Sequence, residues 1–272
     1  MPGVNPMALP LSGRSALITG VSRRRGIGYA VASRLAADGA SVFVHHHRAH
    51  DAAQPWGADD LDEVLTGLRA GLTDGATLAD IDLDLADPDA PDELVAAARA
   101  SLGHLDVLVC NHAQSGHDGP LEEITAETLD RHWQVNTRST VLLTRAFAAQ
   151  HDGRETGRVV WLTSGQGQGP TSGTIAYAAS KAALAGLTAS VADPLADRGI
   201  LLNTVNPGPV NTGYLDDVLA GPDAAAVLAR FPAGRAGDPD DPARLVAWLV
   251  SDEGRWMVGQ VLHTEGGFRR WG

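Results

Sequence analysis

The sequence has one cysteine and few basic side chains. Because Cys110 is the only cysteine among 272 residues, no disulfide can form within the chain, which favours a reducing compartment such as the cytoplasm. Lys and Arg number 21 against 33 Asp and Glu, giving a formal net charge of -12. A nucleic-acid-binding protein normally presents an excess of basic side chains. We therefore expect no nucleic acid among the partners.

Long hydrophobic runs are also missing. The N-terminal residues lack the basic start and the apolar stretch of a signal peptide. The longest segment without a charged residue, 159–180, contains several glycines, a proline and many hydroxyl and amide side chains. A membrane span needs about 20 mainly apolar residues. These absences predict a cytoplasmic protein that does not bind a membrane.

Short apolar, β-branched segments alternate with segments rich in Ala and Leu along the whole chain. The first kind predicts strands at residues 15–19, 41–45, 77–82, 107–110, 158–163, 201–205 and 260–263. The second kind predicts helices at residues 27–38, 59–70, 92–102, 125–149, 176–192 and 242–251. Nearly continuous apolar strands that alternate with helices are typical of parallel sheets. We predict an α/β protein with a single Rossmann-type, doubly wound parallel sheet of about seven strands and helices on both faces.

The domain organisation is expected to be simple. No linker, repeat or break in composition divides the chain, so we expect residues 14–272 to form one domain after an N-terminal extension of residues 1–13. Residues 211–241 interrupt the alternation with Gly, Pro and two short predicted helices, and we expect a mobile flap there. Ligands of such sheets bind outside the carboxyl ends of the strands. The loops after strands one, four, five and six should therefore converge on one site.

A glycine-rich turn follows the first predicted strand and opens the first helix. Glycines are favoured there because the backbone must turn tightly and approach a pyrophosphate, whose charge rests on the helix N-terminus. A strand-to-helix turn without a ligand is the alternative. The candidate dinucleotide contacts in this turn are Gly20, Ser22, Arg23, Gly26, Ile27 and Gly28.

The residues around this turn favour NADP(H) over NAD(H). Enzymes that prefer NAD place an acid about 20 residues past the glycines, on the ribose 2′-hydroxyl. Here the second strand ends in three histidines and Arg48, with no acid before Asp51. Guanidinium groups match phosphate geometry, so Arg23 is the candidate for a 2′-phosphate, helped by His46 or Arg48. Solvated loop arginines are the alternative. Consecutive strand residues point to opposite faces, so we expect no metal site at the histidines.

Tyr177 and Lys181 lie four residues apart on a predicted helix and therefore share one face. Ser164 ends the fifth predicted strand, from which a loop can return it over the start of that helix. A lysine ammonium, with an oxidised nicotinamide nearby, is expected to lower the tyrosine pKa from its usual value near 10. Tyr177 could then give a proton to a carbonyl oxygen as hydride arrives, or take one from an alcohol, while Ser164 holds the same oxygen. An ordinary surface Tyr–Lys pair is the alternative.

These motifs together resemble the short-chain dehydrogenase/reductase family, and within it the 3-oxoacyl-(acyl-carrier-protein) reductases. The resemblance runs from Arg14 to Gly267 and rests on the Thr-Gly…Gly-Ile-Gly turn, on Ser followed by Tyr-x3-Lys, and on "NPGPVNT" after the sixth strand. Five residues separate Gly20 from Gly26 where most members have three, and "NHAQ" replaces Asn-Asn-Ala-Gly.

The resemblance implies a role for each matching residue, and a homotetramer. It makes Ser164, Tyr177 and Lys181 a catalytic triad, with Asn136 supporting a proton-relay water. The remaining cofactor contacts that it implies are Asp84 and Leu85 at the adenine, Asn111 and Ala113 at the ribose, and Pro207, Gly208, Val210 and Thr212 along the nicotinamide carboxamide.

The predicted function is an NADP(H)-dependent oxidoreductase that interconverts a ketone or 3-oxoacyl carbonyl and a secondary alcohol by hydride transfer. The substrate is expected to be a small carbonyl or alcohol compound, acyl thioesters included, with free ketones, polyketide fragments and sugar-like alcohols all open. The alternative is a non-catalytic dinucleotide-binding sensor or scaffold on the same fold. Such sensors usually lack Tyr or Lys, whereas this chain has Ser, Tyr, Lys and Asn together.

Overall fold

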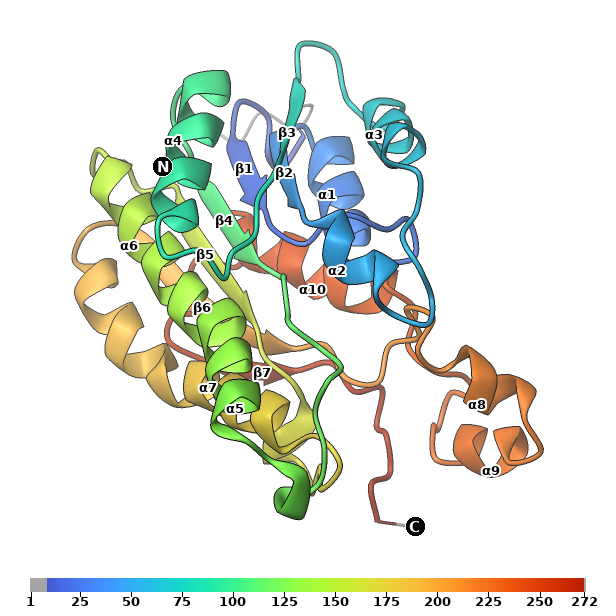
Figure 1. The fold of residues 1–272 in the computed structure, drawn as a ribbon. Helices are drawn as coiled ribbons and strands as arrows, with labels where there is room; N and C mark the ends of the chain where they lie inside the picture. Colours follow the sequence, from blue (N-terminus) through green and yellow to red (C-terminus); the bar gives the residue numbers. More distant parts are fainter. Residues whose placement is uncertain (1–8, 272) are drawn as a thin grey trace.

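A computed structural model describes residues 9–271 (Figure 1). Its seven parallel strands form one sheet in the order β3-β2-β1-β4-β5-β6-β7. This is the doubly wound sheet that the sequence predicted. The strands are β1 (Ser15–Ile18), β2 (Ser41–His46), β3 (Leu78–Asp82), β4 (Val107–Cys110), β5 (Gly157–Leu162), β6 (Ile200–Asn206) and β7 (Val261–His263).

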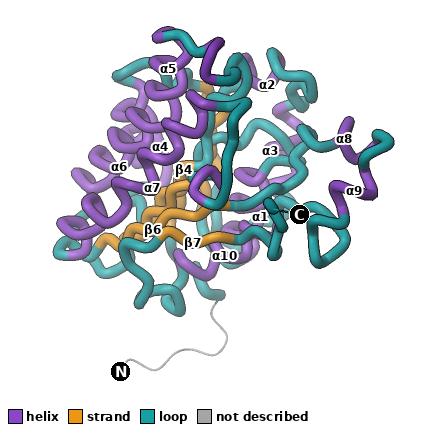
Figure 2. Tube along the Cα trace, turned by 90° about the horizontal axis from the view of Figure 1, so that it is seen from below, coloured by secondary structure: helices purple, strands orange, loops and turns teal. Residues whose placement is uncertain are grey.

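Helices cover both faces of the sheet. Figure 2 shows α4, α6 and α7 on one side of the strands, and α1 and α10 on the other. The helices are α1 (Ile27–Ala37), α2 (Arg48–Ala52), α3 (Leu61–Arg69), α4 (Ala90–Leu102), α5 (Ala126–His132), α6 (Ser139–Gln150), α7 (Ile175–Ala196), α8 (Asp216–Ala220), α9 (Ala224–Leu228) and α10 (Asp240–Val250). The sequence did not predict the short helix α2.

Each face of the sheet has its own hydrophobic core. Side chains of successive strand residues point to opposite faces, so Leu17 of β1 packs with α4 and α6 while Ile18 packs with α1 and α10. Both side chains are fully buried. Because both faces are covered, the strands are apolar along nearly their whole length, as in other parallel sheets.

The long helix expected at residues 125–149 is three consecutive pieces. Thr125 caps the first, since its Oγ1 accepts a hydrogen bond from the N–H of Thr128 (3.1 Å). Between α5 and α6 the chain forms a π-helix, Trp133–Arg138. In this wider turn the carbonyl of Val135 accepts hydrogen bonds from the ring of His112 (3.0 Å) and from Ser139. Such π-turns occur mainly at functional sites, and this one contains Asn136.

The ends of the domain differ in part from the expectation. Residues 1–8 of the expected N-terminal extension lie outside the described residues. Leu11 is fully buried, and its N–H donates to the carbonyl of Asp38 (2.8 Å), so the packed part of the chain begins before residue 14. The flap holds the two short helices that were expected, α8 and α9, which project from the body in Figure 1.

Helix α7 is the one helix within residues 9–271 that is long and apolar enough to cross a membrane by length and composition. It packs against β6 and buries polar side chains, among them Ser180, Lys181 and Thr188. These contacts identify α7 as a core helix of the domain. The uncharged segment 159–180 noted in the sequence is therefore β5, a loop and the first turn of α7.

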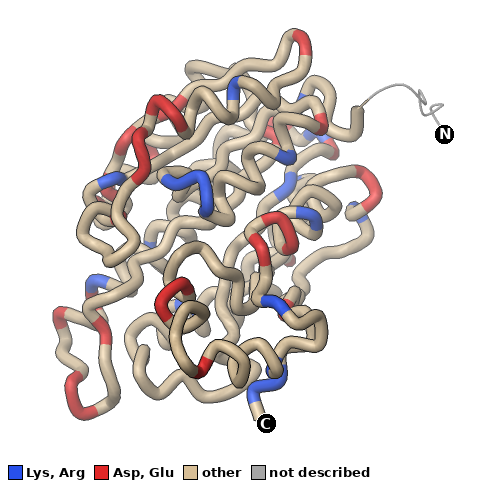
Figure 3. Tube along the Cα trace, turned by 90° about the vertical axis from the view of Figure 1, so that its right-hand side faces the viewer, with Lys and Arg blue, Asp and Glu red and all other residues tan. Residues whose placement is uncertain are grey.

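Basic side chains on the surface are mostly paired with acids. Arg34 donates to Asp240 (3.0 Å), and Arg235 donates to Asp241 (2.7 Å). In Figure 3 short basic segments are interspersed with acidic ones on the face that it presents.

Candidate active site

A cavity of about 590 Å³ opens at the carboxyl ends of the strands. The loops after β1, β4, β5 and β6 all contribute to its wall, as the sheet topology predicted. The predicted site residues that line it are Gly20, Ser22, Arg23, Gly26, Ile27, Asp84, Leu85, Asn111, Ala113, Ser164, Tyr177, Lys181, Pro207, Gly208, Val210 and Thr212. Four predicted residues do not line it, namely Gly28, His46, Arg48 and Asn136.

The glycine turn depends on two positions without a side chain. Gly20 has φ +72°, a conformation that favours glycine. A Cβ on Gly28 would lie 2.4 Å from the carbonyl oxygen of Gly20 and 2.6 Å from Nδ2 of Asn111. Gly28 therefore lets α1 pack closely on the turn and does not itself face the ligand. The Asn111 amide holds the turn by donating to the carbonyls of Thr19 and Gly20, both at 3.0 Å.

Gly28→Ala should therefore disrupt the turn. We expect a loss of about 1–3 kcal/mol in the free energy of unfolding, because backbone atoms must move to admit the methyl group, together with weaker dinucleotide binding. Gly186→Ala is the matched control, since this exposed glycine of α7 has nothing within 4 Å of its Cβ position. The control should gain about 0.5–1 kcal/mol. Urea unfolding of both variants measures the difference, and equal stabilities would contradict the assignment.

The N-terminus of α1 is open towards the cavity. Gly26 precedes the helix without a side-chain cap, and the first turn carries no acid. The first N–H groups of a helix have no partner within the helix and bind anions. Gly26 and Ile27 line the cavity, so this end of the cavity fits a pyrophosphate.

The three arginines of the glycine turn, residues 23–25, contact different partners. Arg25 makes a bidentate pair with Asp216 of α8 (2.8 and 2.9 Å), and the N–H of Arg24 donates to Asp59 (2.7 Å). Only Arg23 lines the cavity. Its guanidinium donates to the carbonyl of Thr212 (2.7 Å) and lies 5.4 Å from the centre of the Trp56 ring. Arg23 therefore links the glycine turn to the start of the flap.

The end of β2 differs from the sequence prediction. His46 turns away from the cavity to Asp80, with Nε2 at 3.1 Å from the carboxylate. His45 and His47 line the cavity instead, because side chains alternate along a strand. Burial lowers the pKa of His45 to about 4, so its ring is neutral. Arg48 is exposed at the start of α2 and was not brought to the cavity.

The loop after β4 is held by the residue that departs from the family pattern. His112 contacts Thr19 Oγ1 through Nδ1 (2.6 Å) and Ser139 Oγ through Nε2 (2.7 Å). Burial keeps the pKa of His112 well below its ordinary value. A neutral ring thus ties the end of β1 to the start of α6.

Asp84, after β3, also lines the cavity. Its carboxylate accepts from the N–H of Ala86 (2.8 Å) and lies 3.7 Å from Arg131.

Asn136 is fully buried and its side-chain amide is satisfied by the protein. Oδ1 accepts from the N–H of Gln114 (2.6 Å), and Nδ2 donates to the carbonyl of Gln114 (3.2 Å) and to Ser180 Oγ (2.9 Å). The side chain thus joins the π-helix to the loop after β4 and to α7. Its contacts position neighbouring segments, whereas the family resemblance implied support of a relay water.

Ser164, Tyr177 and Lys181 come together at the nicotinamide end expected for the cavity. Tyr177 and Ser164 both line this part of the cavity, and the Ser164 hydroxyl acts to lower the pKa of the phenol. Lys181 Nζ donates to the carbonyl of Leu162 (2.9 Å) and lies 6.0 Å from the centre of the Tyr177 ring. Burial lowers the pKa of Lys181 to about 8.

The expected fall in the pKa of Tyr177 included an oxidised nicotinamide, and the chain alone behaves differently. Burial raises the pKa of this phenol, because the phenolate loses its hydration, and the Ser164 hydroxyl only partly opposes the shift. Lys181 is directed to the Leu162 carbonyl. The isolated protein therefore holds Tyr177 as a neutral acid, which is the form that donates a proton to a carbonyl oxygen.

Several cavity residues were not identified from the sequence. Trp56 reaches the cavity from the segment after α2, and Asp118 from the loop after β4. No local motif marks these two positions. Tyr214, a residue of the predicted flap, also lines the cavity and is 48% exposed. Alternation along β2 was the one available signal: it places His45 and His47 on one face and His46 on the other, without saying which face meets the cavity.

Comparisons with known proteins agree with this geometry. Residues 20–269 match a family model described as enoyl-(acyl carrier protein) reductase. The chain is 37% identical to the uncharacterized oxidoreductase YjdA of Bacillus subtilis (94% of this chain, 96% of the relative) and 34% identical to the 3-oxoacyl-(acyl-carrier-protein) reductase FabG of Escherichia coli (94% and 97%). A short-chain dehydrogenase of Burkholderia cenocepacia, solved in complex with NADP, superposes with a TM-score of 0.79 at 35% identity (95% and 98%). The chain belongs to the short-chain dehydrogenase/reductase family and is an oxidoreductase of the FabG-like type.

Proposed function

We propose that the chain is an NADP(H)-dependent carbonyl reductase in which Tyr177 is the acid/base group. One observation carries this proposal: a single cavity runs from the open N-terminus of α1 to Ser164 and Tyr177. A dinucleotide bound along it would have its pyrophosphate at Gly26 and its nicotinamide near Tyr177. When bound, NADPH supplies the hydride.

The protein's own part is to bind, orient and protonate. Ser164 would hold the substrate oxygen by a hydrogen bond while Tyr177 donates its hydroxyl proton to that oxygen as it gains negative charge. Lys181, a cation below its pKa of about 8, would favour the tyrosinate that remains. In the reverse direction the tyrosinate accepts the proton of an alcohol.

The preference for NADP(H) is part of the proposal. β2 ends in His46 and is followed by His47, without the carboxylate that binds the ribose 2′-hydroxyl in enzymes that prefer NAD. Asp51, the first acid of the following segment, is engaged by the Ser22 hydroxyl. His47 lines the cavity beside it, and the Burkholderia cenocepacia relative was solved with NADP. We propose His47 as the group that meets the phosphate.

A paired titration of NADPH and NADH tests this cofactor assignment. Trp56 lies on the cavity wall, so its fluorescence should be quenched on binding, and Trp56→Phe should remove most of the signal. We expect NADPH to bind at least tenfold more tightly than NADH. A preference for NADH would overturn the assignment, and binding of neither would favour the sensor alternative.

Arg23→Ala should weaken NADPH and NADH by a similar factor of about tenfold. The guanidinium is held at Thr212 and Trp56, in a part of the cavity that both cofactors would occupy, and a hydrogen bond to a charged group contributes about 1.5–3 kcal/mol. This differs from the sequence prediction of a 2′-phosphate contact. Arg25→Ala is the control, because Arg25 pairs with Asp216 outside the cavity. A loss confined to NADPH would restore the 2′-phosphate role.

We propose carbonyl compounds as substrates, with 3-oxoacyl thioesters first among them. The FabG relatives are named for that activity, and flap residues such as Tyr214 provide apolar surface at the cavity. The net charge of -12 disfavours attraction of an acidic carrier protein. Acetoacetyl-CoA, its small pantetheine-like thioester analogue and ethyl acetoacetate should therefore be compared by NADPH oxidation. Dinucleotide binding without turnover on any carbonyl would support the sensor alternative.

A homotetramer in the cytoplasm completes the proposal. Large apolar side chains are exposed on the π-helix and near the last strand, including Trp133 (49%) and Trp256 (93%). We propose that these exposed tryptophans lie at subunit contacts. The single, buried thiol of Cys110 fits a reducing compartment. Light scattering after gel filtration measures the assembly, and a monomer would contradict it.

A further inference from the structure

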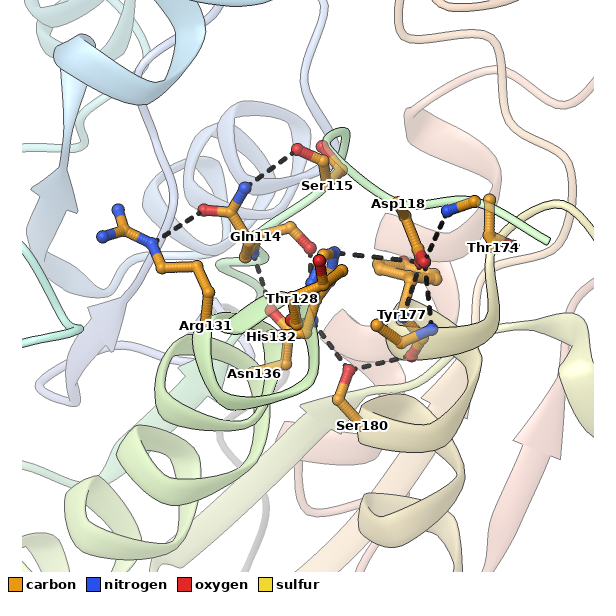
Figure 4. Close-up of polar contacts among 12 residues, drawn as sticks. Gln114, Ser115, Asp118, Thr128, Arg131, His132, Asn136, Thr174, Tyr177 and Ser180 are labelled. Atoms are coloured by element: carbon orange, nitrogen blue, oxygen red, sulfur yellow. Dashed lines mark hydrogen bonds and ion pairs between the residues drawn. The ribbon is translucent and has the colours of Figure 1, made fainter. Parts of the chain in front are cut away.

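Asp118 is a buried carboxylate whose partners lie at the start of α7 (Figure 4). Its side chain is 3% exposed. Oδ2 accepts from the N–H of Tyr177 (2.8 Å), and Oδ1 accepts from the N–H groups of Ala176 (3.1 Å) and Gly119 (2.8 Å). The residue that precedes the helix, Thr174, makes no side-chain cap. Asp118 therefore caps α7 from a different segment of the chain.

This cap acts on the main chain of the catalytic tyrosine itself. The first N–H groups of a helix lack partners within it, and a carboxylate there is also favoured by the helix dipole. On the other side of the same residue, the Tyr177 carbonyl accepts from Ser180 Oγ (2.8 Å), which in turn accepts from Asn136 Nδ2 (2.9 Å). Figure 4 shows these contacts reaching the first turns of α7 from the π-helix and the loop after β4. The N–H of Tyr177 is thus held from outside α7, and its carbonyl is held by Ser180, which Asn136 contacts from outside α7.

His132 closes the space behind the carboxylate. Its Nδ1 donates to the carbonyl of Thr128 (2.9 Å), and its Nε2 lies 3.9 Å from Asp118 Oδ2. That nitrogen is buried and has no hydrogen-bond partner. The ring covers the carboxylate on the side of α5, which leaves the backbone N–H groups as its hydrogen-bond donors.

We propose that Asp118 is a positioning residue for proton transfer. By fixing the first turn of α7, it fixes where the phenol of Tyr177 stands beside Ser164. This inference rests on the proposed function, because position matters only if Tyr177 transfers the proton. A displacement of about 1 Å in a reacting group can cost about 10²-fold in rate. All the hydrogen bonds of Asp118 go to the backbone, so its loss should lower kcat and leave dinucleotide affinity nearly unchanged.

Asp118→Asn is the informative variant. It keeps the size of the side chain but replaces one acceptor oxygen by an amide NH2, which cannot accept from the helix. We expect kcat to fall about 10- to 100-fold, with the Kd for NADPH and the substrate KM within about twofold of wild type. All rates are measured at a temperature where melting curves show the protein fully folded. If Asp118→Asn does not fold, Asp118→Ser, whose hydroxyl can accept one N–H, replaces it with the same expectations.

Asp60→Asn is the matched control. Asp60 caps α3 in the same way, by accepting from the N–H groups of Asp62 (2.8 Å) and Glu63 (3.2 Å), but it does not line the cavity. Loss of a cap should cost this variant about 1 kcal/mol of stability and leave kcat unchanged. A merely structural role for Asp118 would give the two variants the same result.

Three outcomes separate this inference from the proposed function. Turnover that is lost in Tyr177→Phe and retained within twofold in Asp118→Asn overturns the positioning role alone. A fall in kcat matched by an equal loss of NADPH affinity also overturns it, because the cavity as a whole has then changed. A wild-type protein that neither binds dinucleotide nor turns over a carbonyl overturns the proposed function, and the positioning role falls with it.

Discussion

Tyr177→Phe should lower kcat by about 10²–10⁴-fold while leaving the affinity for NADPH within about twofold. General acid catalysis contributes about this factor in enzymes, and phenylalanine removes the phenol hydroxyl without changing the shape of the ring. The ring itself stays in the cavity wall. NADPH oxidation at saturating substrate measures kcat, and fluorescence titration measures affinity.

The chain's two other tyrosines provide the controls. Tyr29 lies on α1 outside the cavity, so Tyr29→Phe should leave both quantities unchanged. Tyr214 lines the cavity from the flap, so Tyr214→Phe tests whether any phenol in the cavity can supply the proton. A kcat near the wild-type value in Tyr177→Phe, with loss in Tyr214→Phe, would transfer the acid/base role to the flap.

The sheet could be predicted from the sequence because each strand carries its own signal. Strands buried on both faces are nearly continuous apolar runs, and Val107–Cys110 is such a run. The break at Trp133–Arg138 could not be predicted, since a π-helix has no residue types of its own and six residues are too few to show its different period. That break depends on tertiary partners, above all His112, which the chain brings in from β4.

The candidate site could be predicted from the sequence where the spacing of residues along one helix or turn determines which of them come together. Tyr177 and Lys181 share a helix face, and Gly20 and Gly28 frame one turn, so their proximity follows from local geometry. Asp118 reaches the N–H of Tyr177 across 59 residues of sequence, and no motif records such a contact. His46 shows that such prediction is limited even within one strand. The alternation was known, but which of the histidines faces the cavity depended on the register with β3.

Lys181→Met should abolish most activity and at the same time stabilise the fold. Lys181 is the only lysine of the chain and is 2% exposed. Burial lowers its pKa from 10.5 to about 8, so below pH 8 the protein bears the full cost of a buried ammonium. Methionine removes this cost, but it also removes the hydrogen bond that Lys181 donates to the Leu162 carbonyl. On balance we expect the free energy of unfolding of the variant to exceed that of wild type by about 1–2 kcal/mol at pH 7. The rate should fall at least about 10²-fold.

The pH dependence of the stability difference between wild type and Lys181→Met identifies the cause of that difference. Between pH 8 and 10.5 the unfolded chain binds more protons at Lys181 than the folded protein, so the stability of wild type should rise with pH relative to the variant. Cys110, whose pKa burial raises, gives an opposite slope that is common to both proteins and cancels in the comparison. Urea unfolding at pH 7 and pH 10 measures the difference, which should shrink at the higher pH. Because there is one lysine, its ¹³Cε resonance reports the pKa directly, and a midpoint above pH 10 would show that the ammonium is hydrated and that Lys181→Met has no such stability to gain.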